Sequence, residues 1–118
     1  MSEYLQELAQ KLELNYLGVV GSDGIIIYQT PYEKEGLPEE VAGELSEIVS
    51  DLRRLLLRNI PGAVPKTLYL DTENGHRVGL MALQPDIFLM AFLSPGSYWG
   101  KVSFYLSKSR QEILSHIL

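Results

Sequence analysis

The stretch that decides the fold runs from Lys66 to Leu93, KTLYLDTENGHRVGLMALQPDIFLMAFL. Its Asn74-Gly75 pair readily takes the positive φ angles of a two-residue type I′ turn, which predicts a β-hairpin between strands at Lys66–Glu73 and His76–Leu83. The run Ile87–Leu93 is apolar without polar alternation, so a strand there should be covered on both faces. The stretch therefore predicts three sequential strands, with the last at the centre of a sheet.

The turn type also fixes the pairing of the two hairpin strands. With two residues in the turn, the expected cross-strand pairs are Glu73 with His76, Asp71 with Val78, Tyr69 with Leu80, Leu70 with Gly79 and Leu68 with Met81. Tyr69 and Asp71 then lie on one face of the sheet, and Leu68 and Leu70 lie on the other.

Two elements are predicted near the amino terminus. Apolar residues at spacings of three and four predict a short amphipathic helix over Ser2–Leu12, with Ser2 as its N-cap and Asn15 as its exit residue. The runs Tyr16–Val20 and Ile25–Tyr28, joined by Gly21-Ser22-Asp23-Gly24, predict a second β-hairpin. An Ile-rich strand, not a helix, follows these glycines, so they indicate a turn and not a phosphate-binding loop.

The longest periodic stretch, about residues 37–60, predicts a helix with Pro38 in its first turn and Pro61-Gly62 just past its end. One apolar stripe follows the helical period: Leu37, Val41, Leu45, Ile48, Leu52 and Leu55. Four more residues widen the apolar arc to roughly 140°, where about 100° is usual for a surface helix: Ala42, Val49, Leu56 and Ile60. Such a helix is expected to pack against two partners.

The carboxyl-terminal part is expected to be a loop, Ser94–Gly100, followed by one helix over Lys101–Leu118. That helix should bury Val102, Tyr105, Leu106, Ile113 and Ile117. Tyr98 and Trp99 in the loop either anchor a partner or pack under a helix end. The order α-β-β-α-β-β-β-α indicates an α+β fold in one domain, residues 1–118, with a mainly antiparallel sheet and helices on both of its faces.

Composition excludes several classes of function. The chain has 118 residues, a net charge of −5 and no cysteine, which argues against nucleic-acid binding, disulfides, thiolate metal sites and cysteine nucleophiles. Its longest apolar run, Ile87–Leu93, is far shorter than the roughly 20 residues that span a bilayer. The amino terminus lacks the basic-then-apolar order of a signal. We expect a cytoplasmic protein with no membrane segment.

No motif indicates an enzyme, a cofactor site or a metal site. His76 and His116 have no recognised ligand spacing and are expected at the surface. No strained-turn motif surrounds Ser22, Ser94 or Ser97, so nucleophilic catalysis is not predicted. One acidic row on the long helix could chelate a cation, although such rows are more often solvated faces: Glu40, Glu44, Glu47 and Asp51.

Association with a second chain explains two features at once. The strand Lys66–Glu73 lies at the end of any sheet centred on Ile87–Leu93, and a bare apolar edge invites pairing. The wide apolar arc of the long helix also requires a second partner. Two copies joined strand to strand, with their long helices packed across a two-fold axis, would satisfy both needs. The interface predicted on these grounds consists of Ala42, Val49, Arg53, Leu56, Ile60, Leu68, Tyr69 and Leu70.

The order of elements resembles the Roadblock/light-chain-7 family over about residues 3–118, and most closely its bacterial and archaeal branch that includes the mutual-gliding regulator. The matching segments are LNYLGVVGSDGIIIYQT, RNIPGAVPKTLYL, DTENGHRVGLMAL and IFLMAFL. Gly18, Ser22, Asp23 and Gly24 fit the family's first hairpin. These residues are fold markers, and none of them is catalytic.

The resemblance implies a five-stranded antiparallel sheet with the long helix on one face and the terminal helices on the other, and dimers with a ten-stranded sheet. It also implies a non-enzymatic regulator or scaffold of a small Ras-like GTPase, with a GTPase-activating role that uses no catalytic residue of this chain as one form of regulation. The second chain of the dimer is either the same protein or a paralogue. No arginine finger can be transferred by motif. Two alternatives remain: a structural scaffold without a GTPase, and a small-molecule sensor. A core filled by Ile25, Ile27, Leu89 and Phe92 would leave the sensor little room.

Overall fold

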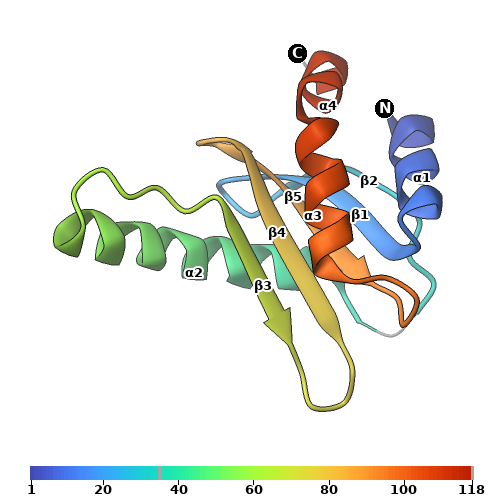
Figure 1. Cartoon of the computed structure of the whole chain (residues 1–118), viewed down its shortest axis with the longest axis horizontal. Helices are drawn as coiled ribbons and strands as arrows, with labels where there is room; N and C mark the ends of the chain where they lie inside the picture. Colours follow the sequence, from blue (N-terminus) through green and yellow to red (C-terminus); the bar gives the residue numbers. More distant parts are fainter. Residues whose placement is uncertain (35, 118) are drawn as a thin grey trace.

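The apolar strand β5 (Ile87–Leu93) lies at the centre of a five-stranded antiparallel sheet, as its sequence predicts. Its neighbours are β1 (Leu14–Gly21) and β4 (Arg77–Gln84), and the edges are β2 (Ile26–Gln29) and β3 (Thr67–Asp71). The order across the sheet is β2-β1-β5-β4-β3 (Figure 1). This architecture comes from a computed structural model, which describes residues 1–34 and 36–117.

Helices cover both faces of the sheet, so the predicted α+β class and its layers are confirmed (Figure 1). On one face, α1 (Ser2–Lys11), α3 (Trp99–Lys108) and α4 (Arg110–Ile117) bury Leu5, Leu8, Val102, Leu106 and Ile113 against β1, β4 and β5. On the other face, α2 (Pro38–Asn59) buries Ala42 and Leu45 against a second set of strand residues. Alternate residues of β5 enter the two clusters, because successive strand side chains point to opposite faces.

The helix ends differ from the sequence predictions in four places. The last helix is two helices, because the chain breaks at Ser109, and α3 begins at Trp99 inside the predicted loop. Tyr105 is 37% exposed and so does not belong to the core. At the amino terminus Met1 takes the N-cap position predicted for Ser2. α1 ends at Lys11, and Glu13, which has a positive φ of 56°, follows it before the predicted exit residue Asn15.

The predicted register of the β3–β4 hairpin is wrong by one residue. Leu68 pairs with Leu80, Tyr69 with Gly79, and Asp71 with Arg77. The connection is a three-residue turn, Glu73-Asn74-Gly75, in which Gly75 alone has a positive φ. A type I′ turn needs positive φ at both Asn74 and Gly75, so the predicted turn type is also wrong.

Thr72 explains why the turn is longer than predicted. Its hydroxyl oxygen lies 2.6 Å from Asn74 Oδ1 and accepts a hydrogen bond of 2.9 Å from the His76 amide. The Gly75 amide donates to the Thr72 carbonyl at 3.0 Å, which is the bond of a type I turn followed by a left-handed glycine. The threonine side chain therefore selects the three-residue turn over the Asn-Gly turn.

The first hairpin forms as predicted, but its isoleucines do not fill the core. Ile25 precedes β2 and is 64% exposed, and Ile27, which a bulge in the β1–β2 pairing skips, is 47% exposed. The turn itself fixes α2: Gly24 has a φ of 83°, and a Cβ on it would lie 2.8 Å from the Gly43 Cα. Only glycine allows the turn and the helix to approach so closely.

Trp99 packs on β4 at the one position where the strand offers space for it. Its ring stacks on Tyr69 with centroids 5.9 Å apart, over Gly79, the cross-strand partner of Tyr69. A Cβ on Gly79 would overlap the ring. The sequence analysis left two roles open for Tyr98 and Trp99, anchoring a partner or packing under a helix end. Trp99 packs under its own helix, whereas Tyr98 is 63% exposed.

We expect Gly79→Ala to lower the free energy of unfolding by about 1–3 kcal/mol, because the Trp99 ring must move out of a packed site. Gly43→Ala is the matched control, since nothing lies within 4 Å of its added Cβ and alanine favours the helix. Urea unfolding followed by Trp99 fluorescence measures both. Equal stability of the Gly79→Ala variant and the wild type would contradict the packing described for Trp99.

Candidate partner-binding face

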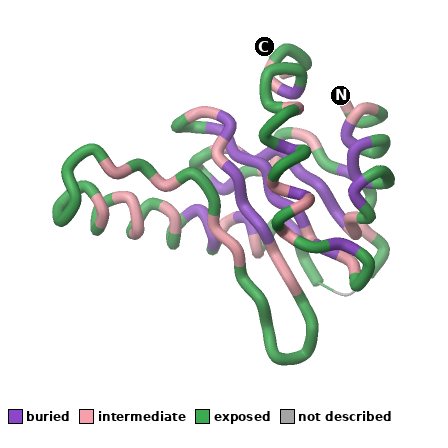
Figure 2. The backbone as a smooth tube through the Cα atoms, in the orientation of Figure 1, coloured by how far each residue is buried: buried purple, intermediate pink, exposed green. Residues whose placement is uncertain are grey.

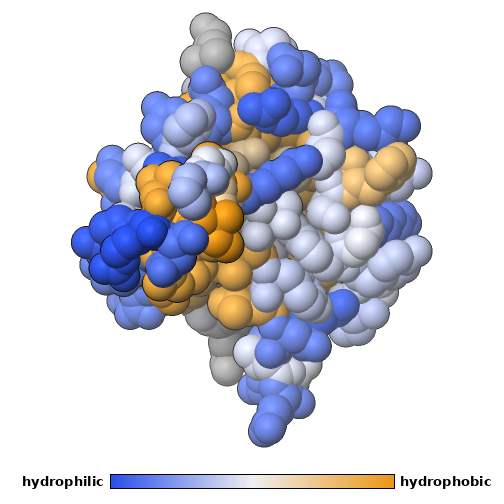
Figure 3. Space-filling model, turned by 60° about the vertical axis from the view of Figure 1, so that its left-hand side comes forward, coloured by the Kyte–Doolittle hydropathy of each residue, from blue (hydrophilic) through white to orange (hydrophobic). Residues whose placement is uncertain are grey.

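The second half of α2 extends beyond the sheet and has no core to enter. All of α2 lies within the described residues, and none of its side chains beyond Ser46 is buried. Figure 2 shows this change along the helix, from buried at its start to exposed at its far end. Figure 3, which looks toward that end, shows hydrophobic residues gathered there with hydrophilic ones beside them. The helix is thus longer than the surface it covers.

The exposed part of α2 is apolar on the side nearest to β3. Leu52 lies at the middle of this surface, with Ile48 and Leu55 on its outer flank and Val49 and Leu56 on its inner flank, as the helical period requires. The inner flank lines a groove of about 210 Å³ that also contains Leu68 and Leu80 of the sheet. We call this surface the α2–β3 face; it consists of Ile48, Val49, Leu52, Leu55, Leu56, Ile60, Leu68 and Leu70.

The outer edge of β3 has unpaired backbone groups. The Ala82 amide donates to the Lys66 carbonyl, and the Thr72 amide donates to the His76 carbonyl. In an antiparallel pair such bonds recur at every second residue, so the even-numbered residues of this stretch bond to β4. The amides and carbonyls of Thr67, Tyr69 and Asp71 therefore point away from the sheet.

The predicted interface residues occupy three environments. Ala42 is fully buried in the core under α2, so it is not available to a partner in this conformation. Tyr69 lies on the opposite face of the sheet, stacked on Trp99. The other six lie together at the groove: half-buried Arg53 is one of its lining residues, and five lie on the α2–β3 face: Val49, Leu56, Ile60, Leu68 and Leu70.

The sequence analysis placed Ile48, Leu52 and Leu55 on one apolar stripe of the helix but did not include them in the predicted interface. Ile48 and Leu55 are 46% and 47% exposed. The wide apolar arc of the helix indicated that some of its apolar residues would be exposed, but it does not show which part of the arc packs against the chain's own sheet. That depends on where the Gly24 turn holds α2.

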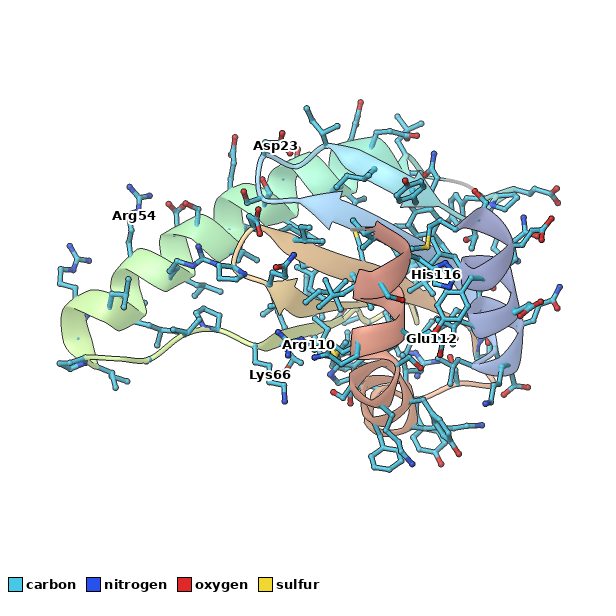
Figure 4. All side chains as sticks on the ribbon, turned by 90° about the horizontal axis from the view of Figure 1, so that it is seen from above. Asp23, Arg54, Lys66, Arg110, Glu112 and His116 are labelled. Atoms are coloured by element: carbon cyan, nitrogen blue, oxygen red, sulfur yellow. The ribbon has the colours of Figure 1, made fainter. Side chains whose placement is uncertain are left out.

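A second cavity, of about 430 Å³, opens beside the groove and gathers three cationic side chains from separate elements. These are Arg53 of α2, Lys66 before β3 and Arg110 at the start of α4. Figure 4 shows Lys66 and Arg110 at the same end of the sheet, whereas Arg54 extends away from it. None of the described residues that line the cavity is acidic. We call this site the cationic cleft.

Backbone carbonyls hold both arginines of the cationic cleft. Arg53 Nη2 donates to the Pro85 carbonyl at 3.0 Å, and Arg110 Nε donates to the Leu83 carbonyl at 2.8 Å. Arg53 Nε is buried and has no hydrogen-bond partner among the described residues. A buried donor without an acceptor is unfavourable, so this site would be stabilised by an added acceptor.

The other candidate residues lie at the surface or in structural contacts. His76 and His116 are exposed, as predicted, and His116 stacks on Tyr4 with centroids 4.7 Å apart. Ser97 is buried and its hydroxyl donates to the Ser94 carbonyl at 3.1 Å, which closes the loop before α3. The acidic row of α2 is exposed. No group of three or more possible metal ligands occurs within residues 1–34 and 36–117.

Two tyrosines have raised pKa values, and both shifts come chiefly from burial. Desolvation raises the pKa of Tyr16, with a smaller contribution from the charge of Glu39. Desolvation also raises the pKa of Tyr4, helped by its hydrogen bond to Glu112. Tyr16 donates its hydroxyl proton to Gln29 at 2.9 Å. Both groups therefore stay protonated and have structural roles away from the α2–β3 face.

Comparisons with solved structures show what this architecture resembles. A Roadblock/LC7 domain from Streptomyces avermitilis superposes with a TM-score of 0.83 at 9% sequence identity, covering 99% of this chain and 97% of that one. MglB from Myxococcus xanthus gives 0.81 at 11% identity, covering 98% and 93%. MglB in a tetrameric arrangement gives 0.81 at 12% identity, covering 93% and 82%.

The chain therefore has the Roadblock/LC7 fold, and MglB is among the proteins that share it. No protein-family model matches the sequence, and no curated protein sequence does either. Within the described residues, no helix is both long and apolar enough to cross a membrane.

The unpartnered donor of Arg53 leads to a stability prediction. Arg53→Met keeps an apolar stem but removes both the bond to Pro85 and the unsatisfied Nε–H, so we expect the free energy of unfolding to change by less than about 1 kcal/mol. Arg58→Met, at an exposed position of the same helix, is the control. Urea unfolding compares them at a protein concentration low enough for the chain to be monomeric, so that no group of a second copy reaches either arginine. A loss above about 2 kcal/mol for Arg53→Met alone would show that the guanidinium is fully satisfied.

Proposed function

We propose that this chain is a single Roadblock/LC7-type domain that forms a homodimer in the cytoplasm and regulates or anchors a small Ras-like GTPase. The observation that carries the proposal is the α2–β3 face, where an apolar helix surface and an open strand edge lie together. The shared fold with MglB and with Roadblock/LC7 domains supports the same reading.

The two sheet edges are not equally open to pairing. β2 has only four residues and carries a bulge beside Ile27, and both features blunt an edge. β3 is regular over Thr67–Asp71, with three residues whose backbone groups point outward. Pairing through β3 also brings the exposed part of α2 toward the second copy. The β3 edge is therefore the one expected to join two chains.

The charges on α2 favour a second copy packed antiparallel. Acidic residues occupy its first part, from Glu39 to Asp51, and its arginines occupy the last part, from Arg53 to Arg58. A two-fold axis across α2 would place the acidic part of one helix near the basic part of the other. A paralogue could take this place only if it carried the same polarity.

The proposed action on a GTPase does not require a catalytic residue from this chain. Arg53 donates to the Pro85 carbonyl, Arg77 donates to the Ser94 carbonyl, and Arg54 pairs with Asp51. Such arginines are already engaged, whereas an arginine finger must reach the γ-phosphate of the bound nucleotide. The dimer would act by shifting the GTPase between conformations of its own catalytic groups.

The alternatives make different demands on the structure. A structural scaffold would use the same dimer without binding a GTPase. A sensor would need a ligand cavity between sheet and helix. The groove on the α2–β3 face, about 210 Å³, is below the roughly 300 Å³ at which small-molecule pockets begin, whereas a cavity of about 400 Å³ lined by Val41, Val78 and Phe92 reaches that size, so volume alone does not decide against a sensor. The groove also lies on the α2–β3 face, so a second copy would cover it. The dimeric regulator remains the better fit.

Charge placed on the α2–β3 face should break the dimer. We expect Leu55→Glu to weaken self-association at least about tenfold, because a carboxylate would be buried against apolar side chains. Ile25→Glu, at an exposed isoleucine in the first hairpin and outside the α2–β3 face, is the matched control and should leave the mass unchanged. Sedimentation velocity across a concentration series measures both, and equal association of the two variants would rule out this face.

The GTPase proposal is tested separately. The purified chain is mixed with the small Ras-like GTPase encoded in the same genome, loaded with GDP or with a non-hydrolysable GTP analogue. We expect a complex that depends on the nucleotide, a change in GTP turnover, or both, and loss of either with Leu55→Glu. A wild-type dimer that neither binds the GTPase nor alters its turnover would contradict the GTPase proposal and would favour a structural scaffold instead.

A further inference from the structure

The cationic cleft lies at one end of β3, and the acidic residues of the same hairpin lie at the other end. Lys66 immediately precedes the strand, Asp71 ends it, and Glu73 follows in the turn. All three are exposed, and none of them forms an ion pair within the described part of the chain. The edge strand is therefore polarised, with cations at its start and carboxylates at its end.

The backbone of β3 favours one register for pairing with a copy of itself. Its outward groups belong to Thr67, Tyr69 and Asp71, and Tyr69 is the middle residue of the strand. A two-fold axis at Tyr69 would let Tyr69 pair with its own copy and Thr67 pair with Asp71 in both directions, using every outward amide and carbonyl. Any shift of the axis along the strand leaves some of them unpaired.

This register carries the acidic end of one strand to the cationic end of the other. Lys66 would stand opposite Thr72 of the partner subunit, and the partner's Glu73 comes directly after it. The cleft formed by Arg53, Lys66 and Arg110 faces the same end of the strand. Its three cations, and the unpartnered Arg53 Nε, would then lie close to carboxylates that have no partner within their own chain.

We propose that the cationic cleft is the docking site for the acidic hairpin end, Asp71 to Glu73, of a second copy of this chain. This inference rests on the proposed homodimer and adds its register and its selectivity. Each contact occurs twice across the two-fold axis, so the charges act together. A paralogue without carboxylates after its edge strand would lose both contacts, and the pattern therefore selects the same chain as partner.

A pair of charge reversals tests the docking site directly. Lys66→Glu makes the cleft less basic, and Glu73→Lys makes the hairpin end basic; both positions are exposed, so folding should be retained, which far-UV circular dichroism checks. At low salt we expect each variant alone to self-associate about tenfold more weakly than the wild type, because an attraction becomes a repulsion at both contacts.

An equimolar mixture of the two variants separates charge pairing from simple damage. In the mixed dimer one contact places Glu at position 66 against Lys at position 73, and the other keeps the original charges. The mixture should therefore associate about as tightly as the wild type, and added salt should reduce these differences. Lys101→Glu, at a lysine of α3 outside the cleft, is the matched control and should behave as the wild type.

The outcomes distinguish this inference from the proposed homodimer. Variants that associate as tightly as the wild type, or a mixture that stays as weak as either variant alone, would overturn the docking site while leaving the dimer intact. A wild-type chain that stays monomeric at tens of micromolar would overturn the dimer itself. Weak single variants with a restored mixture support the docking site and its register.

Discussion

The length of α2 is the constraint on which the rest of the structure depends. A helix of 22 residues extends about 33 Å, and its own sheet buries it only as far as Ser46. The Gly24 turn fixes where that buried part lies, because it touches the helix backbone at Gly43. The remaining turns, with Leu52 at the middle of their apolar side, must find another surface or stay exposed to water. Exposed apolar patches of this kind commonly mark interaction sites.

The β3 edge and the cationic cleft lie where a partner of the exposed part of α2 would also contact them. A second chain that covers the far part of α2 also reaches the open edge of β3, since the two lie side by side around one groove. The same approach brings a partner to the cations beside Lys66. Apolar area supplies the driving force for such association, and the charges at the strand ends and along α2 supply orientation.

The sequence predicted the fold correctly wherever a residue pattern is compatible with only one structure. The unbroken apolar run of β5 required cover on both faces, and the Pro-Gly pair after α2 ended the helix. Prediction failed where a side chain outweighed a pattern. Thr72 hydrogen-bonds across the turn and moves the β3–β4 register by one residue, and the bulge at Ile27 turns an expected core residue outward.

The candidate site was predicted in part for a related reason. Val49, Leu56, Leu68 and Leu70 follow from amphipathic patterns. A helical wheel does not show how the helix is rotated against its sheet, so the buried Ala42 was included in the predicted interface and the exposed Ile48 was left out of it. Tyr69 was placed without knowledge of Trp99, whose stacking depends on the shifted register. Lys66 and Arg110 are far apart in the sequence, and only the folded chain brings them together.

Hydrogen exchange at β3 tests most directly whether a second copy covers this edge. Neighbouring amides of the strand differ, because some bond to β4 and others point out of the sheet. The Leu68 and Leu70 amides bond within the chain, whereas the Tyr69 amide points outward. If a second copy covers this edge, Tyr69 exchanges as slowly as its two neighbours in NMR spectra of the concentrated protein, and faster on dilution. Rapid exchange at Tyr69 beside protected Leu68 and Leu70 at every concentration would contradict the account.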